Sequence, residues 1–197
     1  ALLTEKDTIV LADFDNTTGD PVFDGALKQA LAVQLGQSPF LNILSDRKVL
    51  ESLQLMGRKS TQKVTRDVAR ELCIRTGSKA LLAGTVSNLG GQYVLGIDAV
   101  GCSSGDTLGK EQEVAATKED VLKAVGKAAS NLRAKLGESL ATIQKFDVPV
   151  EATTASLEAL KAFSMGMTTF RTEGKAESLP VYKRAVELVP KFAVDYA

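Results

Sequence analysis

The pattern of apolar and polar positions predicts a strand followed by a helix at the start of the chain. Residues 8–14 form an apolar, β-branched run bounded by polar residues, which is typical of a strand. Turn and capping residues follow at 16–20, and a proline next to them suits the first position of a helix. The helix, starting at Asp20 or Asp24, has apolar positions three or four residues apart: Phe23, Leu27, Ala30, Leu31 and Leu35.

Three further elements follow before the pattern changes. Residues 40–44 form a short apolar run that predicts a second strand. Two amphipathic helices are expected after it, the first running to about Met56 and ending at Gly57. The second begins after Thr65, a good capping residue, and ends at Gly77.

The next section has the period of strands. Residues 80–86, 93–100 and 108–115 are strand candidates, and their connectors at 88–91 and 103–106 are rich in residues that accept positive φ. We therefore expect an antiparallel meander. A capping box, Thr117-x-x-Asp120, precedes a long amphipathic helix that should end at Gly137. The order β-α-β-α-α-β-β-β-α predicts an α/β fold with a mixed five-stranded sheet and flanking helices.

The last fifty residues have only the helical period. Patterns at 157–170 and 176–188 predict an all-α hairpin on a separate module. We therefore divide the chain into a tail at 1–7, an α/β domain at 8–146, a linker at 147–154 and a helical module at 155–197.

Charge and length narrow the function classes. The chain has 24 basic and 24 acidic residues with no basic cluster, so attraction to nucleic acid or to an anionic membrane is not indicated. No apolar run approaches the roughly 18 residues that span a bilayer. Both ends, at Ala1 and Ala197, are expected to be cuts in a longer protein.

Histidine is absent from the sequence, which removes Ser-His-Asp and Cys-His nucleophile pairs and the commonest zinc ligand. The two cysteines, Cys73 and Cys102, lie far apart in no metal-type spacing. We interpret them as two buried small apolar residues, with a disulfide between them as the alternative. No cofactor or metal site is predicted.

The predicted hairpin resembles a tetratricopeptide repeat of 34 residues. Gly166 fits the small residue where the two helices cross, Tyr182 the aromatic of the second helix, Ala185 the small residue after it and Pro190 the closing proline. The chain departs from the repeat pattern at four places: Ala162, Thr169, Ser178 and Pro180. An unrelated helical hairpin is the alternative. The resemblance implies further repeats and protein partners bound along the array.

The residues Asp13-Phe14-Asp15-Asn16-Thr17, directly after a strand, resemble the first motif of haloacid-dehalogenase-like phosphatases. That resemblance implies Asp13 as nucleophile, Asp15 as general acid and Mg²⁺ between carboxylates. The further acidic pair that such chemistry needs is missing, and a meander does not suit the parallel core of that family. The phosphatase is therefore the alternative hypothesis.

The whole segment from Ile9 to Asp20 resembles TolB-like amino-terminal domains of bacteria, in which an aromatic, an Asn, a Ser or Thr and Gly-Asp-Pro follow a strand. Here these are Phe14, Asn16, Thr18, Gly19, Asp20 and Pro21. The resemblance covers about residues 8–136 and implies a non-catalytic sensory or interaction domain. If this domain binds a partner, we expect its binding loop at the carboxyl end of the first strand, and the alternative is a purely structural turn. The loop consists of Asn16, Thr17, Thr18, Gly19 and Asp20.

Residues 3–14 resemble regions of bacterial serine/threonine kinases in which a kinase domain and a membrane span precede a TolB-like domain and its repeats. This resemblance implies an extracytoplasmic, periplasmic position in a membrane-anchored signalling protein. It implies protein partners and no kinase activity within these 197 residues.

Overall fold

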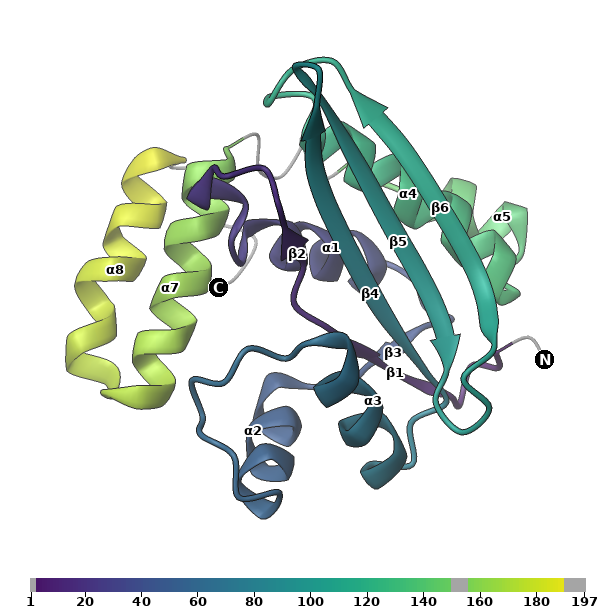
Figure 1. The fold of residues 1–197 in the computed structure, drawn as a ribbon, viewed down its shortest axis with the longest axis horizontal. Helices are drawn as coiled ribbons and strands as arrows, with labels where there is room; N and C mark the ends of the chain where they lie inside the picture. The colour runs from purple at the N-terminus through teal and green to yellow at the C-terminus, as the bar shows by residue number, and fades with distance from the viewer. Residues whose placement is uncertain (1–2, 150–155, 190–197) are drawn as a thin grey trace.

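The structure, a computed structural model, describes residues 3–149 and 156–189. It confirms a mixed α/β architecture with helices on both faces of one sheet (Figure 1). The strands are β1 (Thr8–Leu11), β2 (Asp15–Asn16), β3 (Asn42–Ile43), β4 (Ala80–Leu89), β5 (Gln92–Gly101) and β6 (Thr107–Ala115). The helices are η1 (Pro21–Phe23), α1 (Ala26–Gly36), α2 (Asp46–Leu55), α3 (Arg66–Arg75), α4 (Val121–Leu136), α5 (Leu140–Lys145), α7 (Leu157–Thr172) and α8 (Lys175–Leu188).

The sheet has six strands, so the prediction of five was wrong by one. The main order is β3-β1-β4-β5-β6, with β1 parallel to both of its neighbours and β4-β5-β6 forming the expected antiparallel meander. The added strand is β2, which pairs in parallel with β4. After β1 the chain stays beside β4, where Ala12 N donates to Leu82 O and Thr17 N donates to Val86 O. Because this pairing is made with a strand seventy residues away, the local pattern did not reveal it.

Two apolar clusters hold the sheet between its helices. The larger lies between one face of the sheet and helices α1 and α4, and alternate residues of β5, namely Leu95, Ile97 and Ala99, point into it. The smaller lies on the other face, where Val10 of β1 and Leu81 of β4 meet α2 and α3. Since α2 and α3 cover only one end of the sheet, the rest of that face stays open (Figure 1).

Cys73 of α3 and Cys102, just after β5, form a disulfide with their Cα atoms 5.8 Å apart. The favoured interpretation as two separate thiols was therefore wrong, although both side chains are buried as expected. The fold explains the pairing, because α3 packs on the sheet beside the end of β5. Sequence separation alone carries no information on that distance.

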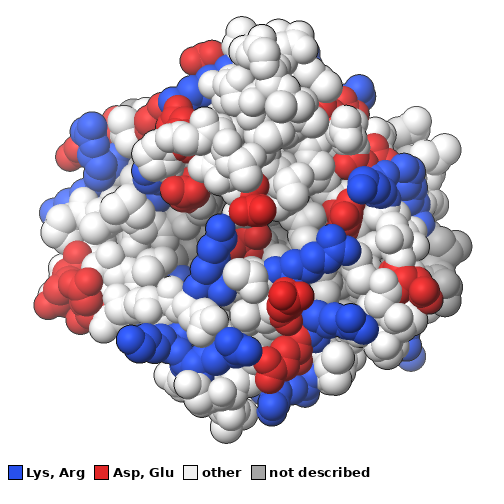
Figure 2. Space-filling model, in the orientation of Figure 1, with Lys and Arg blue, Asp and Glu red and all other residues white. Residues whose placement is uncertain are grey.

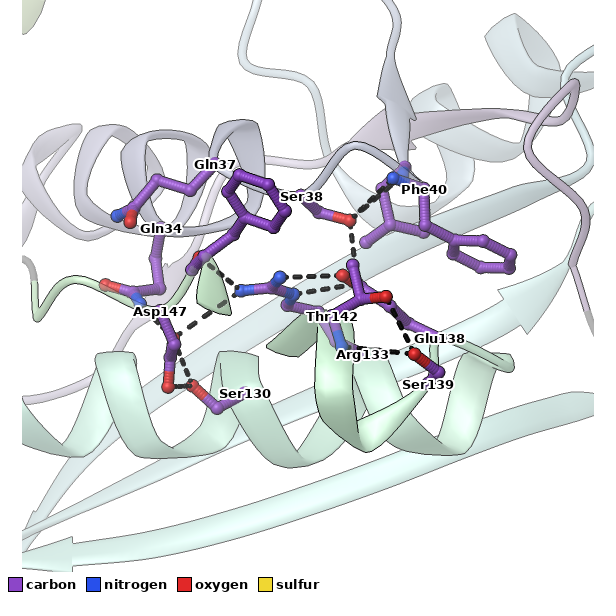
Figure 3. A network of polar contacts seen from close by, with 12 residues as sticks. Gln34, Gln37, Ser38, Phe40, Ser130, Arg133, Glu138, Ser139, Thr142 and Asp147 are labelled. Atoms are coloured by element: carbon purple, nitrogen blue, oxygen red, sulfur yellow. Dashed lines mark hydrogen bonds and ion pairs between the residues drawn. The ribbon is translucent and has the colours of Figure 1, made fainter. Parts of the chain in front are cut away.

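A buried network of hydrogen bonds and ion pairs connects the segment after α5 to helices α1 and α4 (Figure 3). Arg133 of α4 donates from Nε and Nη2 to the two oxygens of Glu138, at 2.8 and 2.7 Å, and both side chains are fully buried. Ser38, after α1, donates to Glu138 at 2.7 Å. Asp147 accepts from Ser130 at 2.7 Å and from Gln34 at 2.6 Å. The network joins α1, α4 and the segment after α5.

Helix α5 was not predicted. Ser139 caps it, with its hydroxyl accepting from Thr142 N at 3.1 Å, and only Ile143 of its residues is buried. A helix of six residues with one buried apolar side chain is too short to show a helical periodicity in the sequence.

Helices α7 and α8 form an antiparallel pair, and α7 lies against α1 and η1 (Figure 1). Leu157, Leu160 and Ala162 of α7, with Ala185 of α8, share the apolar cluster of α1 and α4. The packing is tight at Gly25, which caps α1 with φ of 75°, because a Cβ there would overlap the Ser164 side chain. The pair thus packs on the α/β domain, while the division at residue 147 stays a prediction.

Candidate functional site

The predicted loop at 16–20 is held together by its own side chains. Asn16 donates from Nδ2 to Asp20 O and to Asp24 Oδ1, each at 2.9 Å. Its Oδ1 accepts from both the backbone N and the hydroxyl of Thr18, at 3.0 and 2.7 Å. Asp20 accepts from Val22 N at 2.9 Å and so caps η1. These contacts make turn formation the first role of Asn16, Thr18 and Asp20.

The other two loop residues are exposed. Thr17 pairs with β4 through its backbone, and Gly19 has a φ of 80°, which the turn requires and which side chains disfavour. A role of Asn16, Thr17, Thr18, Gly19 and Asp20 in binding a partner stays a prediction.

An ion pair connects this loop to the segment before α4. Lys118 Nζ lies 2.8 Å from Asp20 Oδ2 and 4.0 Å from Glu158 Oε1 of α7. The hydrogen bond from Lys118, with that from Val22 N, lowers the pKa of Asp20, and the same bond to Asp20 raises the pKa of Lys118. The loop therefore lies where the α/β domain and α7 meet.

A cleft of about 530 Å³ opens next to this junction, at the carboxyl end of β1. One wall comes from Asp13, Phe14 and the start of α1, a second from residues 60–63 of the loop between α2 and α3, and the third from α7. Figure 2 shows that this face of the molecule is hollowed and carries basic and acidic side chains close together. Its volume falls within the range of small-molecule sites, and its position is that of ligand crevices in open α/β sheets.

Asp13 lies in this cleft with both carboxylate oxygens engaged. Oδ1 accepts from Lys28 Nζ at 2.9 Å and Oδ2 accepts from Val64 N at 2.6 Å, so Asp13 fastens the loop that precedes α3 to the end of β1. Asp15 lies exposed on β2. Asp24 and Asp46 line the same cleft as Asp13, yet in the described part of the chain no three acidic or cysteine side chains come close enough to hold a metal ion.

The hairpin residues singled out in the sequence do meet. A Cβ on Gly166 would lie 2.8 Å from Cδ1 and Cε1 of Tyr182, so the α7–α8 crossing requires glycine there. The Tyr182 ring also packs against Phe163, with centroids 5.6 Å apart, and Ala185 is buried. Pro190 lies outside the described residues. A hairpin of this kind is not specific to tetratricopeptide repeats, so the repeat assignment stays a prediction.

Sequence reasoning missed the cleft itself. Lys28, residues 60–63 and Arg171 come from three distant parts of the chain, and none belongs to a motif. Two signals in the sequence indicated the region. The binding loop was expected at the carboxyl end of the first strand, and the phosphatase hypothesis interpreted Asp13, at the same place, as a nucleophile.

Comparison with solved structures shows the fold of the α/β part. The LpoB C-terminal domain from Salmonella enterica matches with a TM-score of 0.52 at 13% identity, covering 58% of this chain and 84% of that chain. The LpoB C-terminal domain from Escherichia coli matches with a TM-score of 0.51 at 14% identity, covering 55% of this chain and 81% of that chain. TolB from Acinetobacter baumannii matches with a TM-score of 0.46 at 12% identity, over 70% of this chain and 30% of that chain, too weakly to carry an argument.

No protein-family model matches the chain, and no curated protein matches it in sequence. At these identities the solved structures show a shared fold and nothing of activity. None of the described helices has the length and apolarity needed to cross a membrane.

Proposed function

We propose that this chain is a non-catalytic protein-interaction module of a larger bacterial signalling protein, in which α7 and α8 begin a tetratricopeptide array. The observation that carries the proposal is the close crossing of α7 and α8 at Gly166 and Tyr182. Glycine at a helix crossing, with the partner helix supplying an aromatic ring, is the geometry expected from the repeat resemblance.

The outward side of the hairpin supports the same proposal. Leu179 and Val186 of α8 lie seven residues apart, hence on one face of the helix, and are 48% and 38% exposed. A single repeat cannot bury its own apolar face, and the next repeat normally covers it. We therefore assign this face to a following repeat or to a protein partner.

The disulfide supports an extracytoplasmic position. Disulfides form and persist in oxidising compartments and are rare in the cytosol. The buried Cys73–Cys102 pair thus favours a periplasmic location. The link to a kinase domain and a membrane span rests on the sequence of residues 3–14 alone, and we retain it as the finer form of the proposal.

Within the α/β domain, our proposed second contact is the loop formed by Asn16, Thr17, Thr18, Gly19 and Asp20. Thr17 and Gly19 are exposed, and Lys118 connects Asp20 of this loop to Glu158 of α7. The phosphatase alternative is tested by turnover of p-nitrophenyl phosphate with Mg²⁺. We expect no turnover above buffer, and metal-dependent turnover that Asp13→Asn abolishes would overturn the non-catalytic assignment.

The interaction role is tested by photo-crosslinking in the bacterium that produces the protein. A photoreactive phenylalanine analogue at Leu179 should give discrete adducts with a protein or with the rest of the same chain. The matched control is Leu140 of α5, which is 69% exposed at the opposite end of the molecule and should give none (Figure 1). Equal labelling at both positions, or no adduct at Leu179, would contradict the proposal.

A further inference from the structure

Within the described part of the chain, some charged side chains of the cleft beside β1 form ion pairs, and others do not. Asp13 and Lys28 neutralise each other at 2.9 Å, and Asp24 accepts a hydrogen bond from Asn16. Arg171 and Lys63 also line the cleft, and neither forms an ion pair with any residue of the described chain. Two cations of the cleft, Arg171 and Lys63, therefore have no carboxylate of the described residues within ion-pair distance.

Arg171 is the less satisfied of the two cations. It lies half-buried on α7, and its only hydrogen bond to a described residue runs from Nη2 to the Thr168 hydroxyl, at 3.2 Å. Its Nε is buried without a partner. A guanidinium carries five donors, and burying donors unpaired costs free energy. Its remaining donors thus lack the acceptors that a bound anion would supply.

Two carboxylates of the cleft, Asp24 and Asp46, would favour a cationic ligand instead. Asp24 is exposed and accepts a hydrogen bond from Asn16, and no cation of the described residues lies within ion-pair distance of it. Asp46 lines the α2 side and has no cation within ion-pair distance among the described residues. It occupies the first turn of α2, where the unpaired N–H groups and the helix dipole already favour a negative charge. The helix dipole therefore stabilises the charge of Asp46, and it does the same for Arg171 in the last turn of α7. The difference is that the Nε of Arg171 is buried with no acceptor among the described residues.

We propose that this cleft binds a carboxylate group, with the guanidinium of Arg171 as its principal partner and Lys63 as a second cation. Arg presents its donors in a planar fork that matches the two oxygens of a carboxylate. Met165 and Met167 on the same wall would contact the aliphatic part of the ligand, as flexible thioether side chains adapt to different shapes. The ligand class is an organic acid or an acidic side chain of a peptide.

The inference goes beyond the proposed function and does not depend on it, because the cleft lies on the inner side of α7 and the docking face on α8. The test follows backbone amide NMR signals of the protein during titration with three probes at constant ionic strength. The probes are sodium glutarate, the peptide acetyl-Glu-Glu-Glu-amide and the uncharged acetyl-Gln-Gln-Gln-amide.

The carboxylate probes should shift the amides of residues 60–63 and 164–171, and the glutamine peptide should not. Amide shifts with glutarate would identify the ligand as a free organic acid. Shifts with the glutamate peptide alone would identify it as an acidic peptide segment, and either result supports the proposal. Arg171→Gln should weaken binding at least tenfold. Arg184→Gln, which removes an exposed arginine of α8 that is paired with Glu187, should leave it unchanged.

Lys63→Gln is a second variant in case Arg171→Gln does not fold. Lys63 is exposed on a loop, so its replacement should leave the fold intact, and we expect it to weaken binding several-fold. Shifts no larger with the carboxylate probes than with the glutamine peptide would overturn the proposal. Unchanged affinity for the carboxylate probes in a folded Arg171→Gln protein would also overturn it. If Arg171→Gln does not fold, unchanged affinity in Lys63→Gln would overturn it instead.

Discussion

Arg133 and Glu138 form a two-bond ion pair in the interior of the protein, at 2.8 and 2.7 Å, with the two side chains 0% and 1% exposed. Both members form further hydrogen bonds, since Ser38 donates to Glu138 and Arg133 Nη1 donates to Phe146 O at 3.1 Å. This arrangement fixes the segment after α5 against α1 and α4, and thereby the point from which the chain leaves toward α7.

Removing one member of this pair should strongly destabilise the fold. Arg133→Met leaves Glu138 as an unpaired buried charge, and we expect a loss of about 3–5 kcal/mol in the free energy of unfolding. The measurement is urea denaturation followed by circular dichroism. The control is Lys127→Met, which breaks a pair with Glu113 whose lysine is 67% exposed and should cost at most about 1 kcal/mol. Equal losses in the two variants would contradict the assignment.

The same pair predicts a dependence of stability on pH. Burial tends to raise the pKa of Glu138, but the hydrogen bonds from Arg133 and Ser38 and the charge of Arg133 outweigh it, so the pKa is lowered. A carboxyl whose pKa is lower in the folded state stabilises the fold above its unfolded pKa of about 4.3 and loses that contribution as the pH falls through the folded value. Denaturation midpoints of the wild type should therefore fall more steeply below about pH 4.3 than those of Glu138→Gln. Parallel curves would refute this.

Two glycines within helices should respond to alanine in opposite directions. At Gly166 the added Cβ would lie 2.8 Å from the Tyr182 ring, so Gly166→Ala must move the ring and should cost about 1–3 kcal/mol. At Gly126 of α4 the nearest atom, Gln34 Oε1, is 3.7 Å away, so Gly126→Ala should stabilise by up to about 1 kcal/mol through helix propensity. Thermal unfolding of both variants checks the difference in sign.

The disulfide should contribute substantially to stability. It closes a loop with a sequence separation of 29, for which chain entropy gives about 3–4 kcal/mol. Cys73→Ala combined with Cys102→Ala should lower the free energy of unfolding by about that amount. Thiol labelling of the wild type under denaturing, non-reducing conditions should find no free cysteine, and two labelled cysteines would show that the pair is not formed.

The sequence predicted those parts of the fold that depend on neighbouring residues. Thr65 caps α3 as the local pattern indicated, and the β4-β5-β6 meander follows from its glycine-rich turns. β2 and the disulfide depend on partners that only the folded chain brings together. The cleft is even harder to predict from sequence. Arg171 and Lys28 line the same cleft only because α7 packs against α1 in the folded chain.

The central claim is that the outer face of α8 is a docking surface, and amide hydrogen exchange tests it most directly. Exchange of the α8 amides should be measured in this chain and in the intact protein purified from its natural source. We predict that amides near Leu179 and Val186 exchange at least tenfold more slowly in the intact protein, while those of α4 are unchanged. Identical exchange of α8 in both samples would contradict the claim.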